Sequence, residues 1–318
     1  MGLATMTQPT FHIPVLVDEV VTYLSDSPPR GEILDGTVGG GGHSAAILER
    51  IEGSRVLAVD RDPHALAAAQ EALAPWEGRV RFLRARFDEG AKGAGLLGPS
   101  LRGALLDLGI SSHQIDDPRR GFAFRSDEVP LDMRMSGGED GAPTAAQLLN
   151  ELDEADLARI FRRYGEEPRG RRLAKAVEAR RAVTPFRTAG DLIGAMSDAY
   201  GRDPMSKERA RVFQALRIAV NLELEALEAA LPLIRDVLLP GGVLVVISYH
   251  SLEDRIVKNA FREWSRECIC PDGIPVCRCR GRALGTALTR RVVRPSEEEI
   301  RTNSRARSAR LRAWRKAA

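Results

Sequence analysis

No run of apolar residues in this sequence approaches the roughly 18 that are needed to cross a lipid bilayer. The N-terminal stretch MGLATMTQPT also lacks the basic segment and the apolar run that together form a secretion signal. Met6 stands where an N-myristoylation motif requires serine or threonine. These absences argue against the common membrane classes, so we expect a cytoplasmic protein with no membrane partner.

Cysteine is scarce, and the four cysteines of the chain lie close together near its C-terminus. They form two C-x-C pairs, which are Cys268 with Cys270 and Cys277 with Cys279. A cytoplasmic location argues against disulfides. Four neighbouring thiols can bind zinc in tetrahedral geometry, although C-x-C is less typical of zinc sites than C-x-x-C. A reduced, basic loop without metal is the alternative.

Negative charge is scarce in the C-terminal part of the chain, although the net charge of the whole is only +3. The segment from Arg278 to Ala318 contains 13 lysines and arginines but 3 acidic residues. The remainder contains 34 basic and 41 acidic residues. A basic tail on an acidic body predicts a polyanionic partner, the alternative being a solvated tail that contacts nothing.

Apolar segments alternate with helical ones in much of the chain, which predicts an α/β domain with a largely parallel sheet. Helices are expected at Val15–Leu24 and His43–Ile51. The expected strands are EILDG from Glu32, Arg55–Asp60, RVRFLRARF from Arg79, Arg102–Gly109 and GGVLVVISYH from Gly241.

The alternation stops between about Ser111 and Met205, where we find no convincing strand and expect an all-helical insertion. A long helical segment then follows over Lys207–Leu239, with a break or kink expected near Pro232. The predicted organisation is an α/β domain in two parts, 1–112 and 207–290, with a helical domain at 113–206 and a basic tail at 291–318.

The stretch LDGTVGGGGHS, residues 34–44, holds five glycines between the first expected strand and the first helix after it. Ligands of doubly wound sheets bind at the carboxyl ends of the strands, where glycine lets the backbone approach them closely. Asp60 ends the second strand, the usual place for an acid that hydrogen-bonds a ribose hydroxyl. The two features predict an adenosine-containing ligand, the alternative being a tight turn and a helix-capping aspartate.

A dinucleotide and S-adenosylmethionine both fit this pattern. The dinucleotide motif G-x-G-x-x-G, started at Gly39 and Gly41, has Ser44 where its third glycine should stand. Asp35 would repel a pyrophosphate, but it suits a ligand that carries an ammonium and a sulfonium group. The methyl donor is favoured. An NAD-dependent oxidoreductase and a non-catalytic RNA-binding protein that uses the basic tail are the alternatives.

Seven segments resemble, in order, the bacterial 16S rRNA (cytosine-N4)-methyltransferase family. They are HIPVLVDEV, DGTVGGGGHS, AVDRDP, LDLGISSHQIDDPRRGFAFRSD, PLDMRM, ISYHSLEDR and NSRARSARLR. The resemblance runs nearly end to end. It implies a Rossmann-like methyltransferase domain with an inserted helical domain. It also implies S-adenosylmethionine-dependent methylation of the exocyclic N4 of one cytidine in the decoding region of 16S rRNA, within the small ribosomal subunit.

The resemblance also assigns functional residues to this chain. Cofactor contacts are expected at Gly41, Gly42, His43, Asp60, Phe87, Asp107 and Gln114. Asp107 is in addition a candidate acceptor for the N4 hydrogens, which would localise the nitrogen lone pair. His250 invites a general-base role or an orienting one, and Tyr249, which stands where the family often has phenylalanine, keeps an aromatic face for the base.

The target base must leave its stack to reach a pocket, so aromatic partners and phosphate ligands are expected nearby. Phe122 and Phe124 are candidates for stacking, while Arg120 and Arg125 are candidates for phosphate binding. The alternative is that the two phenylalanines anchor their loop to the helical insertion, since aromatic side chains usually belong to the core.

Overall fold

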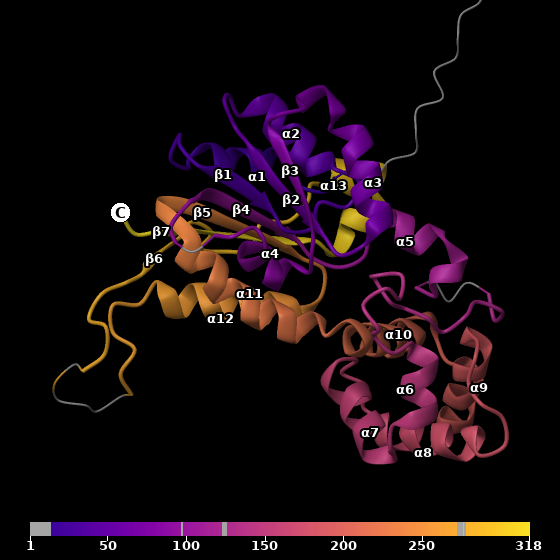
Figure 1. The fold of residues 1–318 in the computed structure, drawn as a ribbon. Helices are drawn as coiled ribbons and strands as arrows, with labels where there is room; N and C mark the ends of the chain where they lie inside the picture. The colour runs from indigo at the N-terminus through magenta and orange to yellow at the C-terminus, as the bar shows by residue number, and fades with distance from the viewer. Residues whose placement is uncertain (1–13, 97, 123–125, 272–275, 277) are drawn as a thin grey trace, which may run out of the picture.

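The computed structural model describes residues 14–96, 98–122, 126–271, 276 and 278–318. At its centre is a seven-stranded sheet with the strand order β3-β2-β1-β4-β5-β7-β6 (Figure 1). The strands are β1 (Glu32–Asp35), β2 (Val56–Asp60), β3 (Val80–Arg84), β4 (Leu101–Asp107), β5 (Leu238–Ser248), β6 (Gly285–Ala287) and β7 (Arg310–Lys316). Strands β1 to β5 are parallel to one another, whereas β7 is antiparallel to both of its neighbours. The predicted α/β architecture is confirmed.

Helices cover both faces of the sheet, which explains why its strands are apolar on both sides. In β5, Val243 and Val245 belong to one core cluster while Leu244 faces the other, as the two-residue period of a strand requires. The first face is covered by α1 (Val17–Ser25), α2 (Gly42–Arg50) and α3 (Pro63–Ala72). The second face is covered by α4 (Phe87–Gly93), α11 (Glu223–Val237) and α12 (Ser251–Trp264) (Figure 1).

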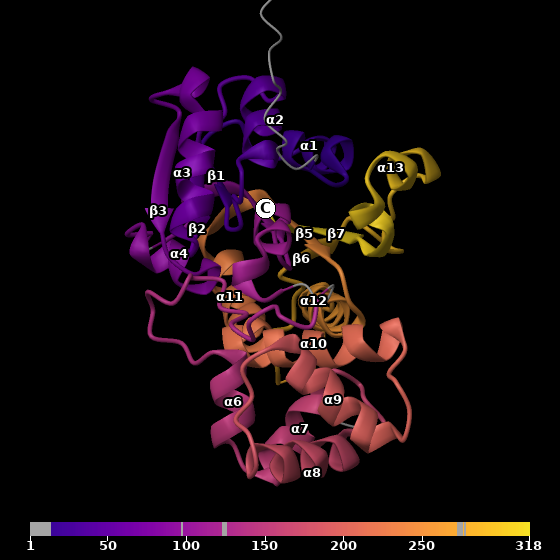
Figure 2. The ribbon, with the colours of Figure 1, turned by 90° about the vertical axis from the view of Figure 1, so that its right-hand side faces the viewer.

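A helical domain is inserted between β4 and β5, as predicted, and it lies beside the sheet in both views (Figures 1 and 2). Its helices are α6 (Ala145–Glu151), α7 (Glu154–Arg163), α8 (Gly170–Arg181), α9 (Ala189–Tyr200) and α10 (Ser206–Asn221). Phe161, Leu173 and Leu192 are buried in its separate core, and so are Val212 and Leu216 of α10. We therefore propose that the second part of the α/β domain begins at α11 rather than at residue 207.

The helix does not break near Pro232, because α11 continues through this residue and the chain turns at Leu222 instead. Leu222 has a φ of 52° and separates α10 from α11, while Pro232 lies inside α11. The side chain of Asn221 donates to the carbonyl of Arg217 (2.9 Å) and to that of Met133 (2.7 Å), which ends α10. Burial of Leu231 against the sheet holds α11 together across the proline.

The prediction of a tail at 291–318 is wrong for its last part. Arg310–Lys316 is strand β7, which lies between β5 and β6 in the sheet. Trp314 is 0% exposed and packs against Phe261 and Trp264 of α12. The three arginines of β7 have acidic partners in the fold, among them Arg312, which contacts Asp254 at 2.7 Å. Just before β7 lie α13 (Glu297–Thr302) and a 3-10 turn at Ser304–Ser308. Among the described residues, no helix is both long and apolar enough to span a membrane.

Candidate functional site

A cavity of about 730 Å³ lies at the carboxyl ends of the central parallel strands. Its size is within the range of small-molecule sites. Residues of the glycine-rich loop, the ends of β2 and β4 and the segment after β5 form much of its wall, and Met135 and Asn221 come from the helical insertion. The predicted residues that line it are Gly42, His43, Asp60, Phe87, Asp107, Gln114 and Tyr249.

The glycine-rich loop leads from β1 into α2 and lines the cavity with backbone. Gly41 caps α2 with a φ of 86°, a conformation that strains other residues. A Cβ atom on Gly42 would come within 3.0 Å of the Pro14 ring. Gly41 itself is not in the cavity wall, because its open side faces Leu73 and Ala69. Its role in the described structure is to make the turn.

Asp60 stands at the end of β2, as predicted, and its carboxylate holds the glycine-rich loop. The backbone N–H of Gly39 donates to one oxygen, and that of Asp62 donates to the other, each at 2.9 Å. Burial raises the pKa of Asp60 to about 6, although these two hydrogen bonds act to lower it. A carboxylate with free lone pairs at the cavity wall can accept hydrogen bonds from hydroxyls of a ligand.

Asp35 was expected to face the ligand, and this expectation is wrong. Its buried carboxylate accepts a hydrogen bond from the Ser44 hydroxyl at 2.6 Å and from the Thr37 backbone N–H at 3.2 Å. Burial raises the pKa of Asp35. The side chain therefore ties the first turn of α2 to the end of β1 and contributes nothing to the cavity wall.

Asp107, Tyr249 and His43 come together from three neighbouring elements. Asp107 ends β4 beside Ile247 of β5, so Tyr249 two residues further on reaches it. The Tyr249 hydroxyl donates to Asp107 Oδ1 at 2.9 Å, and His43 Nε2 lies 3.4 Å from Asp107 Oδ2. Burial, together with the Asp107 charge, raises the pKa of Tyr249 well above its usual value. Tyr249 is therefore a neutral hydrogen-bond donor at physiological pH.

Gln114 and Phe87 also line the cavity. Gln114 lies on the short helix α5 (Ser112–Asp116) and its amide donates to Asp62 Oδ2 at 2.9 Å. Its side-chain oxygen accepts from the backbone N–H of Ser111 at 3.0 Å. Phe87 begins α4 and packs partly into the core. Both positions agree with the predicted contacts to a cofactor.

His250 does not line the cavity, which removes the geometric basis for a general-base role. It caps α12, where its Nδ1 accepts from the backbone N–H of Glu253 at 3.4 Å. Its Nε2 lies 3.1 Å from the Glu253 carboxylate. The imidazole therefore lies against Glu253, but Nε2 makes no hydrogen bond of good geometry among the described residues.

Glu253 and Arg217 line the cavity but were missed in the sequence. Glu253 is 2% exposed and accepts from the backbone N–H of Tyr249 at 2.8 Å. Burial acts to raise its pKa, but the charges of His250 and Arg217 outweigh this and lower it. Arg217 forms a two-pronged pair with Glu223 at 2.8 and 2.9 Å. Its position in the apolar run of α10 was a usable signal, because an arginine there needs a buried partner.

Of the residues predicted to bind the substrate, the two that the structure describes, Phe122 and Arg120, do not line the cavity. Phe122 is 8% exposed and belongs to the core of the helical domain, which agrees with the alternative that it anchors its loop. The Arg120 guanidinium contacts Asp62 at 2.9 Å and donates to the carbonyl of Met135 at 2.8 Å. Phe124 and Arg125 lie outside the described residues.

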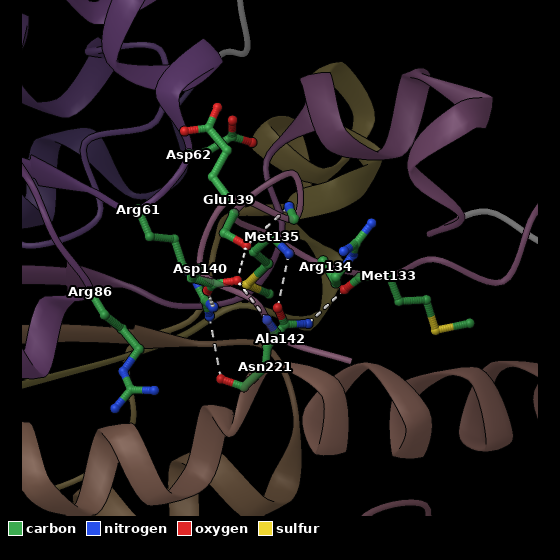
Figure 3. Close-up of polar contacts among 12 residues, drawn as sticks. Arg61, Asp62, Arg86, Met133, Arg134, Met135, Glu139, Asp140, Ala142 and Asn221 are labelled. Carbon is green, nitrogen blue, oxygen red and sulfur yellow. Dashed lines mark hydrogen bonds and ion pairs between the residues drawn. The ribbon is translucent and has the colours of Figure 1, made fainter. Parts of the chain in front are cut away.

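The helical insertion is joined to the cavity by Arg61, which follows β2 (Figure 3). Arg61 contacts Asp140 at 2.6 Å and donates to the backbone carbonyl of Asn221 at 3.3 Å. The Asn221 side chain in turn accepts from the backbone N–H of Met135 at 2.9 Å. These contacts hold the part of the insertion that contributes Met135 and Asn221 to the cavity wall.

Three of the four cysteines also come together, on the segment between α12 and β6. Sulfur atoms of Cys268, Cys270 and Cys279 all lie within 4.8 Å of one another. Cys277 lies outside the described residues.

Comparison with known proteins gives consistent matches along the chain. The MraW methylase family matches residues 9–317. Ribosomal RNA small subunit methyltransferase H of Gemmatimonas aurantiaca is 52% identical over 310 residues, which cover 97% of this chain and 96% of that protein. The protein of the same name from Heliobacterium modesticaldum is 50% identical over 312 residues, or 96% and 98% of the two chains. A solved rRNA methylase of Streptococcus thermophilus aligns over 99% of this chain and all of its own, but with 11% identity and a TM-score of only 0.42.

Proposed function

This chain belongs to the MraW methylase family, and on that premise we propose how its cavity serves methyl transfer. The enzyme is an S-adenosylmethionine-dependent methyltransferase of small-subunit ribosomal RNA, and it methylates N4 of C1402. We further propose that the substrate is the rRNA within the small ribosomal subunit and that the reaction takes place in the cytoplasm, where bacterial subunits are assembled.

The observation that carries the proposed site is the single cavity shared by Asp60, the glycine-rich loop and the Asp107–Tyr249 pair. Asp60 would accept hydrogen bonds from the ribose hydroxyls of S-adenosylmethionine, and Phe87 and Gln114 would contact its other parts. His43 supports a bound group at this place. It is buried, and among the described residues neither ring nitrogen makes a hydrogen bond of good geometry.

S-adenosylmethionine supplies an electrophilic methyl group, so the protein's main task is to align N4 with it and to exclude water. The lone pair of N4 is delocalised into the cytosine ring and is poorly nucleophilic. A carboxylate that accepts the N4 hydrogens would localise this lone pair, and we assign that role to Asp107. Tyr249 would hold the carboxylate through its hydroxyl. N4 gains the methyl group and loses one proton, which needs no strong base, so His250 need not act as one.

The test is methyl incorporation from labelled S-adenosylmethionine into small subunits from cells that lack this enzyme. We expect one methyl group per subunit, which mass spectrometry of rRNA fragments should place on N4 of C1402. Asp60→Ala, with its expected loss of about tenfold or more in cofactor affinity, is the control for a reaction at this cavity. Methylation at another nucleotide would contradict the assignment.

A further inference from the structure

We propose that Cys268, Cys270 and Cys279 bind a zinc ion that holds together the long segment between α12 and β6. This segment spans residues 265–284, and its described residues, 265–271, 276 and 278–284, extend away from the sheet (Figure 1). Its described residues form no helix or strand. Connections longer than about 12–15 residues without secondary structure are uncommon in compact domains, so this one needs some other stabilising element.

The sulfur positions match the geometry of a zinc site. The sulfurs of Cys268 and Cys279 are 3.8 Å apart, and the three lie within 4.8 Å of one another. Zinc–sulfur bonds of about 2.3 Å in a tetrahedron place neighbouring sulfurs about 3.8 Å apart. A disulfide would need a separation of about 2.05 Å. Three thiolates at this spacing supply three of the four ligands of a tetrahedral ion.

A backbone N–H also faces one of the three sulfurs. The backbone N–H of Ile269 donates to Cys279 Sγ at 3.3 Å, a contact of the type that orients metal ligands. Cysteine binds metal as the thiolate.

Hydrophobic burial gives this segment little support. Ile269 is 40% exposed and Val276 is 67% exposed, so these apolar side chains form no core. Arg280 ties the returning arm to the end of α12, with its guanidinium 2.6 Å from the Glu263 carboxylate. A metal ion bound by the three cysteines would join the outgoing and returning parts of the segment, in addition to the Arg280–Glu263 pair. Thiolate ligands favour zinc over magnesium or calcium.

The experiment measures metal in the full-length protein purified without chelator. Elemental analysis by inductively coupled plasma mass spectrometry should find about one zinc ion per chain. Cobalt added to the chelator-treated protein should give the intense absorption of thiolate-to-metal charge transfer. Cys268→Ser, Cys270→Ser and Cys279→Ser should each lower zinc affinity at least about tenfold in competition with a chromophoric chelator.

Ile269→Ser is the matched control, because it changes the residue between two cysteines but keeps every sulfur and the backbone N–H. It should retain zinc as the unchanged protein does. The segment lies outside the cavity wall, so all four variants should bind S-adenosylhomocysteine normally, which reports that they fold. Absence of zinc from the unchanged protein, or full zinc retention by all three serine variants, overturns the proposal.

Discussion

The protonation of Asp60 should make cofactor binding depend on pH. Its pKa in the ligand-free protein is raised to about 6, so the carboxylate that would accept ribose hydroxyls is largely protonated below that pH. Affinity for S-adenosylhomocysteine should therefore fall by up to about tenfold per pH unit below about 6 and be constant well above it. Calorimetry from acidic to neutral pH measures this. Asp60→Asn should bind more weakly at neutral pH and show a much flatter profile, and a profile identical to that of the unchanged protein would remove Asp60 from the site.

Asp107 has two proposed roles, as a cofactor contact and as the acceptor for N4, and one substitution separates them. Asp107→Asn keeps the shape but loses the charge that would localise the N4 lone pair. We expect kcat to fall about 100-fold or more, which is the size of loss seen when a positioned catalytic group is removed. Affinity for S-adenosylhomocysteine should fall less than about tenfold. An equal loss in both quantities would make Asp107 a cofactor contact alone.

The sequence predicted which backbone positions reach the cavity better than it predicted where their side chains point. Asp60 and Asp107 were found because the carboxyl ends of parallel strands meet at one edge of a sheet. Asp35 stands in the same kind of position, yet its carboxylate turns back to Ser44. Glu253 was not singled out in the sequence, and it reaches the cavity wall because α12 packs against α11 and β5.

At the scale of elements, β7 has a structural role that its charge concealed. Leu311 and Ala313 face one core and Trp314 faces the other, so the strand is buried on both sides despite its four basic residues. The count of arginines suggested a basic tail for a polyanionic partner, whereas the alternation within RLRAWRK was the better guide to a strand. The turn at Leu222 could not be predicted, because the hydrogen bonds of Asn221 that cause it reach Met133 and Met135, far away in the sequence.

Because β7 is buried on both sides, removing its largest side chain should destabilise the protein. Trp314→Ala should lower the free energy of unfolding by about 3–5 kcal/mol, because it leaves a cavity beside the rings of Phe261 and Trp264. Urea denaturation followed by circular dichroism measures the change. Arg310→Ala, on the same strand but partly exposed, should change it by less than about 1 kcal/mol. If Trp314→Ala, like Arg310→Ala, changed the free energy of unfolding by less than about 1 kcal/mol, β7 would contribute little to the stability of the fold.

At the scale of the whole molecule, the order of segments could be predicted well, because the alternation of strands and helices stops and resumes around the insertion. The purpose of the insertion is less evident from sequence. Its residues Met135 and Asn221 complete the cavity wall. Its outer helices α7 and α8 carry an exposed group of arginines, Arg159, Arg162, Arg163 and Arg171, around a shallow hollow. This surface is larger than one target base requires, and its charge suits RNA phosphates.

If these arginines bind rRNA phosphates, removing them should slow methylation of small subunits but not of a short oligonucleotide. The double variant Arg162→Gln, Arg171→Gln should lower kcat/KM for small subunits and reduce the log–log salt slope of subunit binding by roughly 1.4–1.8, since each lost phosphate contact accounts for about 0.7–0.9. Binding of S-adenosylhomocysteine should not change. A short oligonucleotide around the target cytidine cannot reach α7 and α8 while its base is in the cavity, so its slow methylation should be the same in both proteins. Remote contacts of this kind raise turnover as well as affinity, because they help to align N4 with the methyl group. If the oligonucleotide is methylated as fast as the subunit, or if the double variant leaves the salt slope unchanged, the insertion does not read the assembled subunit through these arginines.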